Sequence, residues 1–272
     1  MKYKIAGISR KTEFSPNHVL NDFLIINKTA EELVRLGAEV KIYDESVLSR
    51  ELIGEDYVFS MVQGPIGTNT LLKMDENKKF IINSPRSVLN CYRYNMVKLL
   101  PENNIPFPES FIISTSSYRD GELDDFGEKF WLKRGDAHAV HKEDVTLVYT
   151  KNETLSILSE FHRRGIEQAI LQKHLIGDTV KFYAIRETDF FHWYYLNGMY
   201  HTKFDENKLR ELSDTSAKIL GLYVYGGDAI ISPDSKISII DINDWPSFAP
   251  VRDQASQLIA KLIYRKVLEY EN

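Results

Sequence analysis

Short apolar segments alternate with helical patterns through the first 87 residues, and this alternation restricts the fold more than any other feature of the chain. Four segments have the length and composition of strands, namely 3–8, 39–43, 56–61 and 80–83. Between the first two, apolar residues recur at helical spacing at Val19, Phe23, Ile26, Ala30 and Leu33, and Gly37 marks the end of the helix. Strands that alternate with helices predict a parallel sheet covered by helices, in an α/β domain.

Polar residues follow these strands at the points where each strand ends. They are Ser9, Arg10, Gln63, Gly64 and Asn83. Open α/β sheets bind ligands at the carboxyl ends of their strands, so these residues are candidate substrate contacts. Capping of strands and turns explains each of them equally well.

The chain changes character at Pro85. A helical pattern runs from 87 to 100 and ends before Pro101. Pro106 and Pro108 then force an extended connection, because proline cannot continue a helix. We place a domain boundary near residue 88, which gives an α/β domain at 1–88 and a second unit at 89–272.

The second unit has an α+β pattern. Strands are expected at 110–113, 130–133, 146–149, 169–172, 179–186, 191–196, 223–231 and 237–242, and helices at 153–164 and 206–220. A final amphipathic helix carries Ala255, Leu258, Ile259, Leu262 and Ile263. We divide this unit into a small subdomain at about 104–172 and a C-terminal core at about 173–272.

Composition excludes several classes of protein. The 272 residues carry a net charge of −5 with dispersed Lys and Arg, which argues against a general nucleic-acid binder. No apolar stretch is long enough to span a membrane, and the first residues do not resemble a secretory signal. The single Cys91 excludes an internal disulfide framework and a Cys-based zinc cluster. We therefore expect a cytoplasmic protein with no membrane partner.

The hairpin at 223–242 carries the most informative polar residues. Asp241 and Asn243 are two apart on one strand, so both side chains should emerge on one face, with Ile240 and Ile242 on the other. Asp228 on the partner strand can face them. Two carboxylates and an amide oxygen are hard donors that suit magnesium. The alternative is a polar strand end whose acids are solvated or hydrogen bonded.

These residues resemble a known signature. Asp228, followed by the segment Ile240–Phe248, looks like the C-terminal motif of the ATP-grasp superfamily, in which an acid and then an acid-x-Asn motif hold magnesium on the triphosphate. Three more matches follow the family order. They are the segment 90–108 with Arg93 at a phosphate-binding position, 131–135 with Lys133, and 170–185 with an adenine-binding hinge and the basic Lys181. The resemblance covers about residues 88–268.

The resemblance implies a fold and a set of roles. The α/β domain would precede an α+β ATP-grasp fold of the glutathione-synthetase type, whose two subdomains clasp ATP. It implies that ATP is bound by Arg93, Lys133, His138, Gln172, Lys173, His174, Leu175 and Lys181, that Mg²⁺ is held by Asp228, Asp241 and Asn243, and that Lys181 and Arg186 are catalytic. Lys203 and Ser247 are weaker candidates for the acceptor site. His138 and His141 lie in a polar segment that could close over phosphates, although exposed loop histidines are an equally good interpretation.

The implied function is an ADP-forming ligase. Such an enzyme phosphorylates a carboxylate and lets an amine or thiol displace the phosphate, here on a small molecule or peptide. Inositol-trisphosphate kinases share the fold and the Asp-x-Asn form, and Arg10, Lys11 and Arg86 keep that alternative open. A nucleotide-binding module without turnover is a third interpretation. Many members of the superfamily form dimers or tetramers, so a homo-oligomer is compatible with the sequence.

Overall fold

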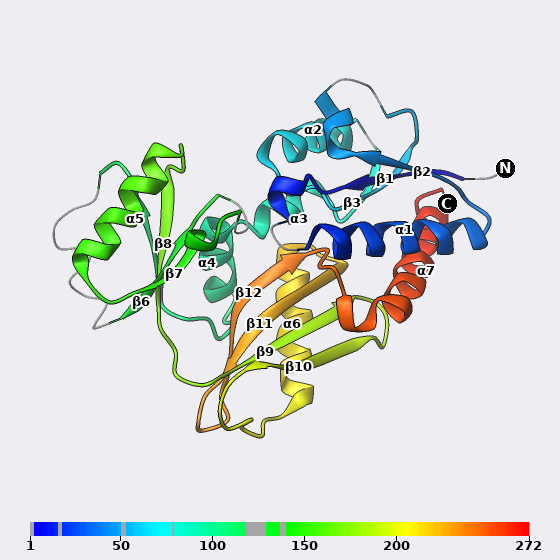
Figure 1. Cartoon of the computed structure of the whole chain (residues 1–272). Helices are drawn as coiled ribbons and strands as arrows, with labels where there is room; N and C mark the ends of the chain where they lie inside the picture. Colours follow the sequence, from blue (N-terminus) through cyan, green and yellow to red (C-terminus); the bar gives the residue numbers. More distant parts are fainter. Residues whose placement is uncertain are drawn as a thin grey trace.

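The computed structural model describes residues 3–15, 18–49, 53–77, 79–117, 129–136 and 140–271. These residues form three four-stranded sheets, which follow one another along the chain (Figure 1). The first sheet is parallel and the other two are antiparallel. The predicted fold class is therefore confirmed.

The first sheet has the strand order β2-β1-β3-β4. Its strands are β1 (Lys4–Ser9), β2 (Glu39–Asp44), β3 (Tyr57–Ser60) and β4 (Phe80–Ile82). Alternate residues face opposite layers, so Ile5 and Phe59 pack in the core that contains α1 (Val19–Arg35), while Ala6 and Val58 pack in the core that contains α2 (Pro65–Glu76). Both faces are covered, which explains why these strands are continuous apolar runs.

The buried face of α1 differs from the predicted one. Val19 and Phe23 are 47% and 59% exposed, whereas Asp22 is buried. Ile26 and Leu33 are buried as expected. The apolar spacing therefore predicted the wrong buried face for the first turn of the helix. Asp22 is buried there because it forms an ion pair with Arg10.

The helical pattern at 87–100 contains two helices rather than one. They are α3 (Pro85–Asn90) and α4 (Arg93–Glu102), and the chain between them is extended at Tyr92. The Tyr92 hydroxyl donates to the carbonyl of Gln63. The extended backbone at Tyr92 gives its side chain a direction that differs from the one a continuous helix would impose. Pro101 lies inside the last turn of α4 instead of after it, where its missing N–H costs one hydrogen bond.

The second sheet has the order β5-β8-β6-β7. Its strands are β5 (Ser110–Ser114), β6 (Phe130–Arg134), β7 (Val145–Val148) and β8 (Gln168–Lys173). Helix α5 (Lys151–Arg163) packs Leu158 and Phe161 against the face that carries Leu132 and Leu171. The opposite face, which carries Trp131, Lys133 and Gln172, lines a cavity, and the start of α4 lies beside it.

The third sheet has the order β10-β9-β11-β12. Its strands are β9 (Asp178–Ile185), β10 (Phe191–Asn197), β11 (Val224–Ile231) and β12 (Ile237–Asp244). Helix α6 (Glu206–Leu220) covers the apolar face and ends at Gly221, whose φ of 82° favours glycine. The face away from α6 carries Lys181, Asp228 and Asp241.

The last helix, α7 (Arg252–Glu271), returns to the first domain. It lies beside α1, so that the red end of the chain meets the blue start in Figure 1. Ile259 and Ile263 of α7 share one core with Ile25 of α1 and Phe59 of β3. The first and third sheets are thus joined by a common apolar core.

Candidate nucleotide and metal site

Four charged side chains form the centre of the candidate site. In the register of the third sheet, Asp228 on β11 lies between Lys181 on β9 and Asp241 on β12. Lys181 Nζ is 2.9 Å from Asp228 Oδ1. Arg93, the first residue of α4, places a guanidinium nitrogen 3.3 Å from Asp241 Oδ2. The two predicted metal acids are therefore neighbours, and each has a cation beside it.

A β-bulge in β12 shapes this row. The register between β11 and β12 shifts between Asp228 and Ala229, which leaves Ile240 as the extra residue. Ile239 and Ile242 are fully buried, whereas Ile240 is half-buried and lines a cavity beside Asp241. The expectation that Ile240 points away from the acids is therefore wrong, because strict alternation does not continue through a bulge.

Lys133 is buried near the end of β6. Its Nζ donates to Gln172 Oε1 on the neighbouring strand β8 at 2.6 Å. Burial lowers the pKa of Lys133 to about 8, although the carboxylate of Asp241 works in the opposite direction. A lysine with this pKa is mostly charged at neutral pH.

The pKa values of Lys181 and Asp228 depend on their burial and on the charge of each other. Burial acts to lower the pKa of Lys181, but the Asp228 carboxylate outweighs it, and the pKa is raised. Burial raises the pKa of Asp228, and Asp241 adds to this effect, while Lys181 opposes it. Two carboxylates directly opposite each other on paired strands repel, and the adjacent cations offset this repulsion.

A cavity of about 360 Å³ separates the second and third sheets. Its walls include the face of the second sheet away from α5, the face of the third sheet away from α6, and the start of α4. Of the residues predicted to bind ATP, those that line it are Arg93, Lys133, Gln172, Lys173, His174 and Leu175, together with Asp228 and Asp241. Trp131 also lines this cavity, and the centroid of its ring lies 6.2 Å from the centroid of the His174 ring. The structure thus brings the two halves of the sequence pattern, from β6–β8 and from β11–β12, to one place.

A second cavity, of about 330 Å³, adjoins the first on the side of the N-terminal domain. The two share Arg93, Asp228 and Asp241. Its other predicted lining residues are Arg10, Gln63, Lys181, Asn243 and Ser247. Phe14, Ser15, His18, Asp22 and Tyr183 line it as well, and sequence reasoning did not select them.

No family model and no curated protein matches the sequence. Solved structures match nearly the whole chain. A D-alanine–D-alanine ligase from Bacillus anthracis complexed with ATP is 14% identical, with a TM-score of 0.73 and 99% of each chain covered. A RimK domain protein ATP-grasp from Sphaerobacter thermophilus is 15% identical, with a TM-score of 0.72, over 96% of this chain and 99% of that one. The ATP-grasp ligase PsnB, complexed with a minimal precursor, is 15% identical, with a TM-score of 0.61, over 97% of this chain and 99% of that one.

This chain has the ATP-grasp fold. The resemblance inferred from the motifs is thereby confirmed at the level of the superfamily fold. Within that fold, the cavity between the second and third sheets lies between the two ATP-grasp subdomains. The cavity of about 330 Å³ lies where the ATP-grasp unit meets the preceding α/β domain.

Three of the five residues at the strand ends join this α/β domain to the ATP-grasp unit. Arg10 donates to the carbonyl of Trp245 and pairs with Asp22. Gln63 donates to Asp244 Oδ1 at 2.8 Å. Asn83 donates to the carbonyl of Val224 and accepts from the amides of Tyr223 and Val224. Ser9, Gly64 and Asn83 line neither cavity.

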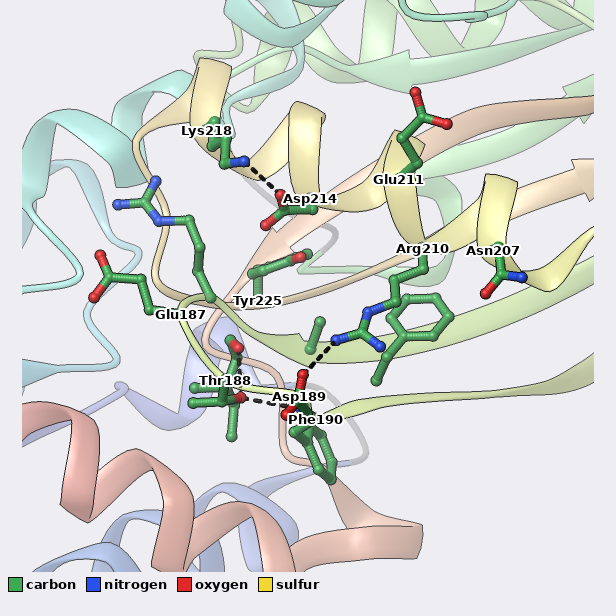
Figure 2. A pocket seen from close by; sticks show the side chains of 14 residues that line it. Glu187, Thr188, Asp189, Phe190, Asn207, Arg210, Glu211, Asp214, Lys218 and Tyr225 are labelled. Atoms are coloured by element: carbon green, nitrogen blue, oxygen red, sulfur yellow. Dashed lines mark hydrogen bonds and ion pairs between the residues drawn. The ribbon is translucent and has the colours of Figure 1, made fainter.

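Arg186 lies apart from the candidate site. It follows β9, five residues beyond Lys181, and its guanidinium lies 3.9 Å from the ring centroid of Tyr223. It lines a separate cavity of about 770 Å³ between the segment 184–191 and α6. Figure 2 shows Arg210 of α6 reaching toward Asp189 across that cavity. The structure therefore does not bring Arg186 to the acids, and its catalytic role stays a prediction.

Three other predicted residues have different positions. His138 lies outside the described residues. The amide of His141 donates to Asp144 Oδ2, so this residue forms part of the base of the segment after Lys133. Lys203 lines neither cavity, and its carbonyl accepts a hydrogen bond from Ser235.

Asp144 anchors the same segment. It is fully buried, and it pairs with Arg134 at 3.1 Å and with Arg164 at 2.7 Å. The amides of Val140 and His141 also donate to it. Burial acts to raise the pKa of Asp144, but these hydrogen bonds, led by that from Arg164, lower it to about 2.

Two absences concern only the described parts of the chain. No three His, Cys, Asp or Glu side chains there are grouped so that they could hold a metal ion among themselves. No helix within those parts has the length and apolar character needed to cross a membrane.

Proposed function

We propose that this chain is an ATP- and Mg²⁺-dependent ligase that joins a carboxylate to an amine or thiol through an acyl phosphate. The observation that carries the proposal is the meeting of two cavities at Arg93, Asp228 and Asp241. One cavity suits a nucleotide and the other suits an acceptor, so the acids and the arginine lie where a phosphoryl group would pass between them.

The donor set at this junction fits magnesium. Asp228 and Asp241 offer carboxylate oxygens from adjacent strands, and Asn243 offers an amide oxygen two residues along β12. Hard oxygen donors of this kind bind Mg²⁺ through one or two carboxylates and leave other positions to phosphates and water. When bound, the ion would neutralise the charge that develops on the transferred phosphoryl group.

The walls of the nucleotide cavity supply the remaining charge and shape. Lys133 and Arg93 are both buried and cationic, so they can bind phosphates without competition from bulk water. The end of β8, at Gln172 to Leu175, offers backbone groups to the base, and Trp131 offers an apolar ring. These residues hold and orient the nucleotide; they need not act as nucleophiles.

The charges around the acceptor cavity support a ligase rather than an inositol-phosphate kinase. Among the described residues that line it, each Arg or Lys already has a carboxylate partner. The pairs are Arg10–Asp22, Arg93–Asp241 and Lys181–Asp228. A polyphosphate would need a surplus of cations, whereas a single carboxylate needs one or two. The names of the similar ATP-grasp structures, which include a D-alanine–D-alanine ligase and a ligase complexed with a minimal precursor, favour the same class.

ATP consumption against a panel of acceptors tests the proposal. The panel would contain amino acids, small peptides, hydroxy acids and inositol phosphates, with ADP, AMP and phosphate measured separately. We expect ADP and phosphate only when a carboxylate and an amine or thiol are both present, and no product with Asp241→Asn. ADP without free phosphate on a hydroxyl acceptor would establish a kinase. Nucleotide binding with no turnover on any acceptor would establish a non-catalytic module.

A further inference from the structure

The four charges at the junction form a neutral row. Lys181, Asp228, Asp241 and Arg93 follow one another, with ion-pair distances of 2.9 Å at one end and 3.3 Å at the other. Their side chains are 24%, 19%, 15% and 7% exposed, in the same order. Water therefore screens them only in part, and removal of any one charge would change the electrostatic potential felt by the other three.

Lys181 has the simpler set of contacts of the two cations. Its Nζ donates to Asp228 Oδ1, and no other hydrogen-bond acceptor is found for it in the described residues. It lines the acceptor cavity but not the nucleotide cavity, whereas Arg93 lines both. An ammonium group released from Asp228 would therefore remain on the acceptor side.

We propose that Lys181 is a positioning residue that serves as the internal counter-ion of Asp228 and suppresses the binding of a divalent cation on its own. A cation that approached the neutral row alone would have to displace the ammonium group from Asp228 and would leave that group without a partner. If an anion arrives as well, the released ammonium group gains a new partner on the acceptor side. Lys181 thereby makes metal binding depend on the presence of phosphates or of an acceptor carboxylate.

This inference rests on the metal site of the proposed function but not on the ligase reaction. It concerns the affinity of the protein for a cation in the absence of nucleotide and acceptor. Mn²⁺ is a suitable probe because it prefers the same oxygen donors and its free form is measured directly by electron paramagnetic resonance.

The test is a titration of the full chain with Mn²⁺ alone. We expect Lys181→Met to bind Mn²⁺ about tenfold more tightly than the wild type or better, because the row then carries a net negative charge. Lys181→Gln keeps a hydrogen-bond donor for Asp228 and removes the charge, so it should behave in the same way. It also preserves the test if the methionine variant folds poorly.

Two further variants serve as controls. Lys208→Met makes the same change in an exposed pair with Glu211, and it should bind Mn²⁺ like the wild type. Adding Asp228→Asn to Lys181→Met should remove the gain, since the acid that was released is then absent. Circular dichroism would confirm that each variant is folded.

The outcomes separate this inference from the proposed function. Equal Mn²⁺ affinity in the wild type and in both Lys181 variants would overturn the inference, and so would an equal gain in Lys208→Met. ATP turnover by a wild type whose Mn²⁺ affinity does not depend on Lys181 would keep the proposed function and reject the counter-ion. Tighter Mn²⁺ binding by the Lys181 variants, with no ATP turnover on any acceptor, would support the counter-ion role and reject the proposed function.

Discussion

Phe59 of β3 stacks on Trp245, which follows β12, with ring centroids 5.8 Å apart and planes inclined by 24°. Both rings are fully buried. Trp245 is two residues beyond Asn243, so the packing of the N-terminal domain fixes the end of the strand that carries the candidate metal ligands. The stability of the interdomain core and the geometry of the site are therefore linked.

Phe59→Ala should destabilise the protein by about 3–5 kcal/mol, because it leaves a cavity beneath Trp245. Phe23→Ala is a matched control, since Phe23 is 59% exposed on α1, and it should change stability by less than about 0.5 kcal/mol. Urea unfolding measures both. Equal effects of the two variants would mean that the domains do not share this core.

Asn83 joins β4 to β11 through three hydrogen bonds to the backbone of Tyr223 and Val224. Asn83→Ala would remove the acceptor of the Tyr223 and Val224 amides, while the Val224 carbonyl keeps the amide of Trp245 as a donor. We expect a loss of about 2–4 kcal/mol of stability. Asn103→Ala removes a single bond from an exposed amide to Leu99 and should cost far less. Thermal melts would compare the melting temperatures of the two variants. A smaller decrease for Asn83→Ala than for Asn103→Ala would contradict a stabilising role of Asn83 between β4 and β11.

Asp144 should stabilise the base of the segment after Lys133 in a pH-dependent way. Its folded pKa of about 2 lies below that of an unfolded aspartate, so its contribution is fully present above about pH 4 and is lost as pH falls toward 2. Asp144→Asn should cost about 2–3 kcal/mol near neutral pH. The difference from the wild type should shrink as pH falls from about 4 to about 2 in urea unfolding. Asp234→Asn, which breaks a pair with Lys236 that solvent screens, is the control and should show a much smaller dependence in the same direction.

Lys133 should make nucleotide binding sensitive to alkaline pH. Its pKa of about 8 means that the ammonium group loses its proton as pH rises from about 7 to 9.5, so the affinity for ADP should fall on the order of tenfold. Lys133→Arg stays charged over this range. Calorimetric titrations at several pH values would compare the two proteins. A parallel decline in the arginine variant would assign the pH dependence to another group.

Much of the fold could be predicted because apolar periodicity is a local property. The four parallel strands, the hairpin at 223–242 and the end of α6 at Gly221 all follow from spacing and turn residues. The buried face of α1 could not be predicted in the same way, because the burial of Asp22 depends on Arg10, which belongs to another element. The break at Tyr92 likewise depends on a contact with Gln63 that appears only after folding.

The candidate site shows the same division. Asp228, Asp241, Arg93 and Lys133 could be selected because their order along the chain resembles a superfamily pattern. The bulge at Ile240 does have a local signal, because the apolar residues stand at 237 and 239 before it and at 240 and 242 after it. The alternation therefore shifts by one residue at Ile239-Ile240, which the assumption of strict alternation overlooked. Ser15, His18 and Asp22 were missed because ordinary polar residues at a helix start carry no mark of the cavity that they will line.

The position of α7 has a consequence for synthesis on the ribosome. Ile259 and Ile263 complete the core that β1 and α1 begin more than 200 residues earlier and to which β3 also contributes. One face of the first sheet therefore stays partly uncovered until residues 252–271 have emerged from the exit tunnel. During that interval the nascent chain exposes apolar surface that is open to aggregation and to chaperones.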